Sequence, residues 1–316
     1  MKQKNYQEVS TKGRVLNPPV HQRATPCAVP MVKMLLFLKT GIILGEIKLK
    51  REHEENAMEL TESQKRFFYE EGYLKVSGAV PRVMVNAARQ AINAEIGKGN
   101  TNPFPEINAT PVITDLFNET PAFSLLESAL GKGNLQRSQT GGIKLNFPRP
   151  PGSSPTDTLT EKIGWGRSGG HLDGIKAVGD RLRGLREDGT YNRNFTSFAV
   201  VYLDDVPVPN GGNFTVWPKS HHFFENYFKE HGHQILNDHM PHVELPEGPV
   251  FVTGEAGDVI FAHHAMVHTG CPNTSPDIRY AVIFRTKHTQ INDIGVDAFT
   301  DIWREWDGVR ETVGVV

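Results

Sequence analysis

The length, composition and charge of this chain are those of a globular protein, and they exclude several functional classes. Its 316 residues are 38% hydrophobic and 22% charged, with a formal net charge of −2, so it can bury a substantial core and gives no reason to expect nucleic acid as a partner. Two cysteines, Cys27 and Cys271, are too few for a disulfide framework. The apolar stretch 31–47 is interrupted by Lys33 and Lys39 and is shorter than the roughly 20 residues that cross a bilayer. We therefore expect a cytoplasmic protein with no membrane span.

The first 57 residues show no coherent pattern of secondary structure. We predict that residues 1–57 form a disordered extension that folding does not require, and an upstream start codon is one explanation for it. Residues 58–316 are expected to form a single folded domain.

Three helices are expected in the first part of this domain. Thr61 followed by Gln64 is typical of a capping box, and Gly72 is a helix stop. Pro81 is a favourable first residue for the second helix, whose apolar residues recur at helical spacing. The predicted helices span 61–72, 81–97 and 121–130, with a short strand at 73–76.

From about residue 135 the pattern changes to short apolar runs separated by glycine and proline. Such runs predict strands, and the turn signals between them indicate an antiparallel sandwich or barrel. The predicted strands span 141–147, 197–203, 213–217, 258–262 and 279–285. The expected fold class is therefore mainly β with flanking helices, with a jelly-roll core.

The sharpest motif is Gly170-His171-Leu172-Asp173-Gly174. In a strand, residues i and i+2 point to the same face, so the imidazole of His171 and the carboxylate of Asp173 can converge on one point. They supply two of the three ligands of the 2-His-1-carboxylate arrangement that holds non-haem iron. The third ligand is expected from a distant strand, where the candidates are His263, His264 and His268.

Arg279 opens the last predicted strand, on the same face as Ala281 and Ile283. A charged guanidinium on this small and apolar lining needs an anionic partner. The distal carboxylate of 2-oxoglutarate would suit, with its keto acid end on the iron. The alternative is a structural arginine paired with an acidic residue such as Asp258.

Together these motifs resemble the phytanoyl-CoA dioxygenase family over about residues 60–288. The motifs that carry the resemblance are His171-x-Asp173, the segments 210–221 and 257–263, His268 and Arg279. The resemblance implies a double-stranded β-helix (jelly-roll, cupin-like) core, with His171, Asp173 and His268 as iron ligands and Arg279 as the anchor of 2-oxoglutarate. It also implies that His263 and His264 pack near the site and do not bind the metal.

Other expectations concern the surroundings of the site. Lys144 and Asn146 share one face of a strand that, in the family, faces the cosubstrate, so both are candidates for contact with 2-oxoglutarate or substrate; a solvated Lys144 is the alternative. For the charged segment 175–193 we favour a solvated loop over a lid that recognises an acidic substrate. Further expectations are a turn shaped by Asn273, core positions for Phe214 and Trp217, and an exposed loop end at His221 and His222.

The implied activity is hydroxylation of a small organic or lipid-like substrate with Fe(II), 2-oxoglutarate and O2. The substrate and the oligomeric state are left open, and a peroxisomal location is not expected because Pro18-Pro19 would break the helix that such a signal prefers. One rival is a cupin-type metalloenzyme without 2-oxoglutarate, which explains the ligands but leaves Arg279 without a role. Another is a catalytically silent binding protein on the same fold, which the complete ligand set supports poorly.

Overall fold

The structure is a computed structural model, and it describes residues 58–100, 104–150, 169–173, 193–232, 241, 243–245 and 247–315. The predicted extension 1–57 lies outside the described residues, as does the charged segment 175–193 apart from Arg193. Within the described ranges, no helix combines the length and apolar character needed to cross a membrane.

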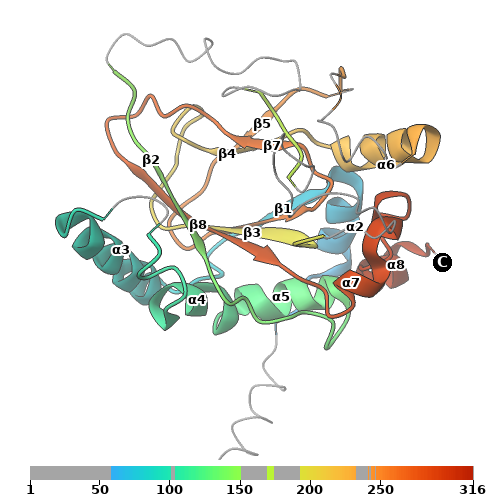
Figure 1. Cartoon of the computed structure of the whole chain (residues 1–316), viewed down its shortest axis with the longest axis horizontal. Helices are drawn as coiled ribbons and strands as arrows, with labels where there is room; N and C mark the ends of the chain where they lie inside the picture. The colour runs from blue at the N-terminus through green and yellow to red at the C-terminus, as the bar shows by residue number, and fades with distance from the viewer. Residues whose placement is uncertain are drawn as a thin grey trace, which may run out of the picture. The chain divides into compact units, whose positions relative to one another are not determined.

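In the described part of the chain, eight strands form two antiparallel sheets at the centre of the domain (Figure 1). The strands are β1 (Tyr73–Val76), β2 (Gly142–Asn146), β3 (Ser197–Tyr202), β4 (Phe214–Val216), β5 (Val250–Val252), β6 (Val259–His263), β7 (His268–Gly270) and β8 (Arg279–Thr286). The larger sheet has the order β1-β6-β3-β8-β2, and the smaller sheet has the order β5-β4-β7.

An apolar cluster lies between the two sheets and holds them together. Phe198 and Val200 of β3 belong to it with Phe214 and Val216 of β4. The alternate β3 residues, such as Val201, belong to a second cluster on the other face of the larger sheet. Because both faces of β3 are covered, all its residues are buried, which explains its continuous apolar sequence.

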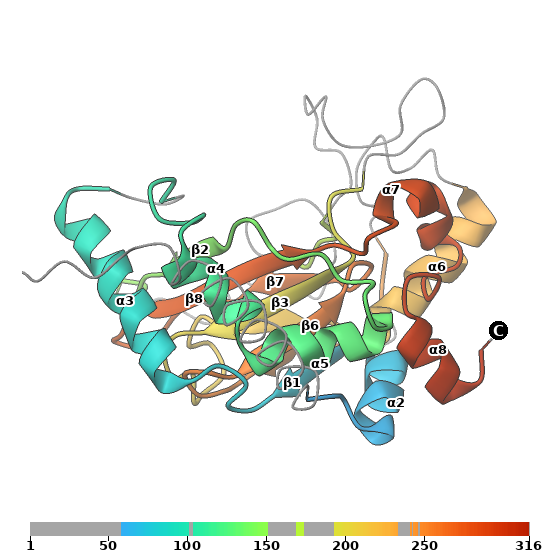
Figure 2. The same cartoon turned by 90° about the horizontal axis from the view of Figure 1, so that it is seen from below.

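The helical elements of the described residues flank the sheets. They are α2 (Glu62–Glu71), α3 (Arg82–Gly97), α4 (Pro111–Asn118), α5 (Pro121–Leu130), α6 (Ser220–His231), α7 (Ile291–Ile294), the 3-10 helix η3 (Gly295–Phe299) and α8 (Asp307–Val313). Both views show that α3, α4 and α5 cover the outer face of the larger sheet, while the smaller sheet lies on the opposite side (Figure 1, Figure 2). The expected jelly-roll core with flanking helices is confirmed, although helical residues outnumber strand residues.

Helix α2 begins and ends as its sequence predicts. The Gln64 amide donates to Thr61 Oγ1 at 3.2 Å, and the Thr61 amide donates to Gln64 Oε1 at 2.9 Å. Gly72 follows in the left-handed region with φ 78°. A Cβ there would lie 2.3 Å from Met266 Cε and 2.4 Å from His221 Nδ1, so only glycine fits both the backbone and the contact.

The expectation of an exposed loop end at His221 and His222 was wrong. Both residues lie in the first turn of α6, and His221 is fully buried. Lys219 adopts φ 63°, which turns the chain directly into the helix. The Nε2 atoms of both histidines lie 2.9 Å from the carbonyl oxygen of Tyr69 on α2, so they join α6 to α2. By contrast, the core positions expected for Phe214 and Trp217 are confirmed.

His263 and His264 pack against the C-terminal segment. Their Nε2 atoms lie 2.9 Å from Ile302 O and 3.2 Å from Ala298 O, respectively. Burial lowers the pKa of His263 to about 3, and it lowers the pKa values of His264 and His221 well below their ordinary value. We call His221, His222, His263 and His264 the histidine cluster.

Candidate metal centre

Two backbone hydrogen bonds bring the two halves of the site together. The amide of His171 donates to His268 O at 3.0 Å, and the amide of His268 donates to His171 O at 3.1 Å. This reciprocal pair joins segment 169–173 to β7, which is itself paired with β4 in the smaller sheet. The spacing of the two backbone positions that carry the imidazoles is therefore set by main-chain hydrogen bonds.

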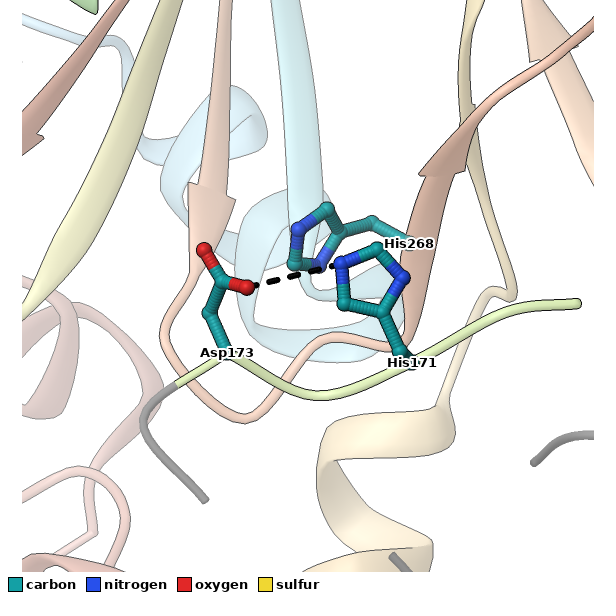
Figure 3. A group of neighbouring side chains, drawn as sticks. All are labelled: His171, Asp173 and His268. Atoms are coloured by element: carbon teal, nitrogen blue, oxygen red, sulfur yellow. Dashed lines mark ion pairs between the residues drawn. The ribbon is translucent and has the colours of Figure 1, made fainter. Parts of the chain in front are cut away.

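The side chains of His171, Asp173 and His268 converge. Each offers one potential ligand atom, and the three atoms lie within 4.8 Å of one another; His171 Nε2 is 3.4 Å from Asp173 Oδ1. In Figure 3 the three side chains point toward one another, His171 and Asp173 from one segment and His268 from β7. No other group of three or more such residues occurs in the described part of the chain.

The hydrogen bonds of His268 leave a lone pair available for a metal ion. Its Nδ1 lies 3.0 Å from the carbonyl oxygen of Met266, so Nδ1 carries the proton and Nε2 does not. Burial lowers the pKa of His268 to about 4. The ring is therefore neutral at physiological pH, which is the form that coordinates a cation.

Asp173 has a partner that the sequence analysis missed. Arg285 of β8 donates to Asp173 Oδ2 from Nε at 3.1 Å and also from Nη2. Burial alone would raise the pKa of Asp173, but the hydrogen bond from His171 and the contacts with Arg285 outweigh it and hold this pKa well below its usual range. The alternation of side chains along the last strand could have indicated this partner, because Arg285 lies on the same face as Arg279, Ala281 and Ile283.

The donor set suits Fe(II). Two imidazole nitrogens and one carboxylate oxygen form a facial arrangement that leaves other coordination positions free. Because Arg285 engages Oδ2 while Oδ1 faces His171, Asp173 offers the centre a single oxygen.

Arg279 lies at the other end of β8, and its described partners are uncharged. Its Nε donates to Gly212 O at 2.7 Å, and Nη1 donates to Lys144 O at 3.2 Å. Burial lowers its pKa. The alternative partner Asp258 is engaged elsewhere, 3.7 Å from Lys75 Nζ and bonded to the amide of Gly78. Among the described residues, no carboxylate neutralises Arg279.

Lys144 and Asn146 both lie on β2, directly beside β8. Lys144 pairs with Ala281 and has an exposed side chain, whereas Asn146 pairs with Arg279. Asn146 Nδ2 donates to Cys271 O at 2.7 Å, and Asn146 O accepts from Asn273 Nδ2 at 2.8 Å. Asn146 thus links β2 to the turn after β7, and the expected turn role of Asn273 is confirmed by its further bond to Asp277 O at 2.7 Å.

Comparison with known proteins shows which protein family the chain resembles. The family model described as phytanoyl-CoA dioxygenase (PhyH) matches residues 180–281, a range that contains His268 and Arg279. The expected family resemblance is confirmed. Phytanoyl-CoA dioxygenases use Fe(II), 2-oxoglutarate and O2, and the match supports an oxygenase that depends on Fe(II) and 2-oxoglutarate.

One similar curated protein is the 1-deoxypentalenic acid 11-beta-hydroxylase of Streptomyces exfoliatus, which is 24% identical over 68% of this chain and 75% of that protein. Among solved structures, the alpha-ketoglutarate-dependent carbocyclase SnoK from nogalamycin biosynthesis is similar at 21% identity, with a TM-score of 0.48 over 73% of this chain and 84% of that one. HygX from Streptomyces hygroscopicus, solved with nickel and 2-oxoglutarate, is similar at 18% identity, with a TM-score of 0.49 over 73% of this chain and 88% of that one.

Proposed function

We propose that this oxygenase binds Fe(II) through His171, Asp173 and His268 and hydroxylates a small organic or lipid-like substrate. The observation that supports the ligand assignment best is the convergence of three potential ligand atoms within 4.8 Å. The name of the similar hydroxylase supports a small organic acid or terpenoid-like molecule as the kind of substrate. When bound, iron and 2-oxoglutarate supply the oxidising chemistry.

The residues of the chain position the reactants. The neutral imidazole of His268 and the single free oxygen of Asp173 present lone pairs to the metal, and Arg279 holds the distal carboxylate of 2-oxoglutarate. The apolar side chains between the two sheets, such as Phe198 and Phe214 beside His268, keep water away from the site.

The ligand assignment is tested with His171→Ala, Asp173→Ala and His268→Ala. Each variant loses one of three ligands, so we expect loss of stoichiometric Fe(II) binding and of succinate formation. His264→Ala is the matched control, because it removes a buried imidazole that bonds Ala298 O and lies outside the group of ligands. It should lower the melting temperature and retain the metal. Full iron content in His268→Ala would refute the assignment.

The role of Arg279 is tested separately. Arg279→Met leaves the distal carboxylate without its partner, which typically costs about 3–5 kcal/mol, or roughly two to four decades of affinity. Arg279→Lys should recover part of this loss, since an ammonium cannot reproduce the guanidinium fork. The measurement is an anaerobic titration of the Fe(II) protein with 2-oxoglutarate, followed by charge-transfer absorption. Unchanged affinity in Arg279→Met would make Arg279 structural and favour a metalloenzyme that does not use this cosubstrate.

Lys144 and Asn146 remain candidates for contact with the cosubstrate or substrate. Asn146 is held by two main-chain partners, so its replacement affects the β2 contact as well. Lys144→Gln tests such a contact with less effect on the fold, because the Lys144 side chain is exposed.

A further inference from the structure

A cavity of about 240 Å³ adjoins the metal centre at the end of β8 opposite Arg279. Its walls come from segment 136–142 and from Ile283, Arg285 and Lys287. Arg285 is common to the cavity and the metal centre, because the same guanidinium bonds Asp173. A molecule in this cavity would therefore lie one side chain away from a proposed iron ligand.

The lining of this cavity is basic. Arg285 and Lys287 contribute cationic side chains, and no acidic residue among those described lines the cavity. Arg137 also lines it, but its guanidinium bonds Asn118 O and Glu119 and lies over the ring of Phe123. Lys287 makes no ion pair with any residue that the structure describes. Among the residues that the structure describes, the carboxylates in contact with the three cations are Glu119, on Arg137, and Asp173, on Arg285.

A bound metal ion would increase the positive character of the cavity. Under the proposed function, Asp173 would share its charge between Fe(II) and Arg285, and Arg285 would be less fully neutralised. Together the cations and the metal favour an anionic group in the space between them.

Hydrogen-bonding groups surround the same space. The wall includes the polar residues Gln136, Ser138, Gln139 and Thr140, and such side chains can bond a polar or charged ligand.

The cavity is separate from the proposed position of 2-oxoglutarate. Arg279 and Arg285 lie six residues apart on one face of β8, which is about 20 Å along a strand. The two guanidiniums also have different partners, the carbonyl oxygens of Gly212 and Lys144 for Arg279 and the carboxylate of Asp173 for Arg285. The cavity is therefore distinct from the proposed anchor of 2-oxoglutarate.

From this arrangement we infer that the cavity lined by Arg137, Arg285 and Lys287 binds the anionic group, a carboxylate or a phosphate, of a small organic substrate. This inference rests on the proposed function and specifies its substrate class. The volume fits a small molecule, or the charged end of a larger one, since pockets for whole drug-sized ligands are about 300–1,000 Å³.

The test uses benzoate, phenyl phosphate and neutral benzamide as probes of the full-length protein, loaded anaerobically with Fe(II) and 2-oxoglutarate. Calorimetric titration should show that at least one anion binds, that its affinity falls with added salt, and that benzamide binds at least about tenfold more weakly. Stronger binding of benzoate than of phenyl phosphate identifies a carboxylate site, and the reverse order identifies a phosphate site.

Lys287→Gln removes a cation that contacts neither the ligands nor Arg279. It should weaken anion binding about tenfold. The matched control is Lys132→Gln, an exposed lysine outside the cavity, which should bind as the parent does. Equal binding in Lys287→Gln and Lys132→Gln, equal affinity for benzamide and benzoate, or no anion binding at millimolar concentration would overturn the inference.

The charge-transfer band of the Fe(II)–2-oxoglutarate complex separates this inference from the proposed function. Lys287→Gln should retain the band with unchanged 2-oxoglutarate affinity. Absence of the band in the parent protein would refute the proposed function, whatever the probes do.

Discussion

The two oxygens of the Asp173 carboxylate face two different partners. Its Oδ2 accepts from Arg285, and its Oδ1 faces His171. The guanidinium also lies 5.6 Å from the centre of the Phe198 ring, which restricts its position. Such partners of a ligand orient it and commonly contribute to metal affinity. Arg285 is therefore a positioning residue for the proposed iron site.

We expect Arg285→Met to weaken Fe(II) binding by about 10–100-fold, the range typical for loss of a partner that orients a ligand. Arg285→Lys should restore part of the affinity. Competition titration of the metal against a chelator measures the effect. The control is Arg304→Met, which removes an exposed pair with Asp297 at 2.7 Å and should leave metal affinity unchanged. Parent-like affinity in Arg285→Met would show that Asp173 needs no such partner.

The sequence alone was sufficient to predict the motif residues but not their neighbours. His171 and Asp173 are two residues apart, so strand geometry brings them together without knowledge of the fold. Arg285 is far from Asp173 in sequence, and only the pairing of β8 within the sheet brings them into contact. Similarly, His221 was predicted to be exposed because nothing local indicates that α2 and the C-terminal segment cover it.

The contact between α5 and α8 depends on a glycine. A Cβ on Gly308 would lie 2.1 Å from Ser128 O and 3.2 Å from Ala129 O. These are backbone atoms of α5, which cannot move without shifting the helix. The close approach therefore excludes every residue larger than glycine at this position.

Gly308→Ala should destabilise the protein by about 1–3 kcal/mol, the typical cost of overpacking. Gly97→Ala is the matched control, because Gly97 is also helical and its Cβ would meet no atom within 4 Å. That change should be neutral or stabilise by up to about 1 kcal/mol. Urea denaturation measures both free energies of unfolding, and equal values would contradict the proposed close approach.

Elements with strong local signals were the ones predicted correctly. Helix α2 has a capping box and a glycine stop, and α3 has apolar residues at regular spacing. Strands β5 and β7 contain three residues each, too few for any periodicity to be recognised. Helix α6 was missed because it begins after an unusual left-handed lysine and not after a capping residue.

At the scale of the whole molecule, the histidine cluster joins segments that are distant in sequence. His221 lies on α6, His263 ends β6, and both contact Trp303 near the C-terminus. Burial keeps three of the four rings neutral, because their pKa values are lowered. The fold class could be predicted from the chain, but this association of segments could not, because it depends on tertiary packing.

This cluster makes stability depend on pH. In the unfolded chain these histidines gain protons near pH 6.5, whereas folded His263 resists protonation until about pH 3. The unfolded state therefore binds more protons between these limits, and stability is lost as the pH falls below 6.5. Each such histidine contributes a slope of about 1.4 kcal/mol per pH unit.

Urea midpoints measured at pH 7.5, 6 and 5 should fall in that order. In His221→Gln or His264→Gln the dependence should be shallower, since one of the three groups no longer titrates. A midpoint that stays constant from pH 7.5 to pH 5 would contradict the neutral, buried state of the cluster.

The reciprocal amide–carbonyl bonds between His171 and His268 have a further consequence. Because they join the two ligand segments through main-chain atoms alone, we expect the conformational entropy of bringing these segments together to be lost during folding and not during metal binding. Loading with iron then requires little rearrangement of the main chain. The main chain around the centre should therefore change little when the ion binds. Loss of the ion should leave the sheet folded, and the protein should bind the metal again without refolding.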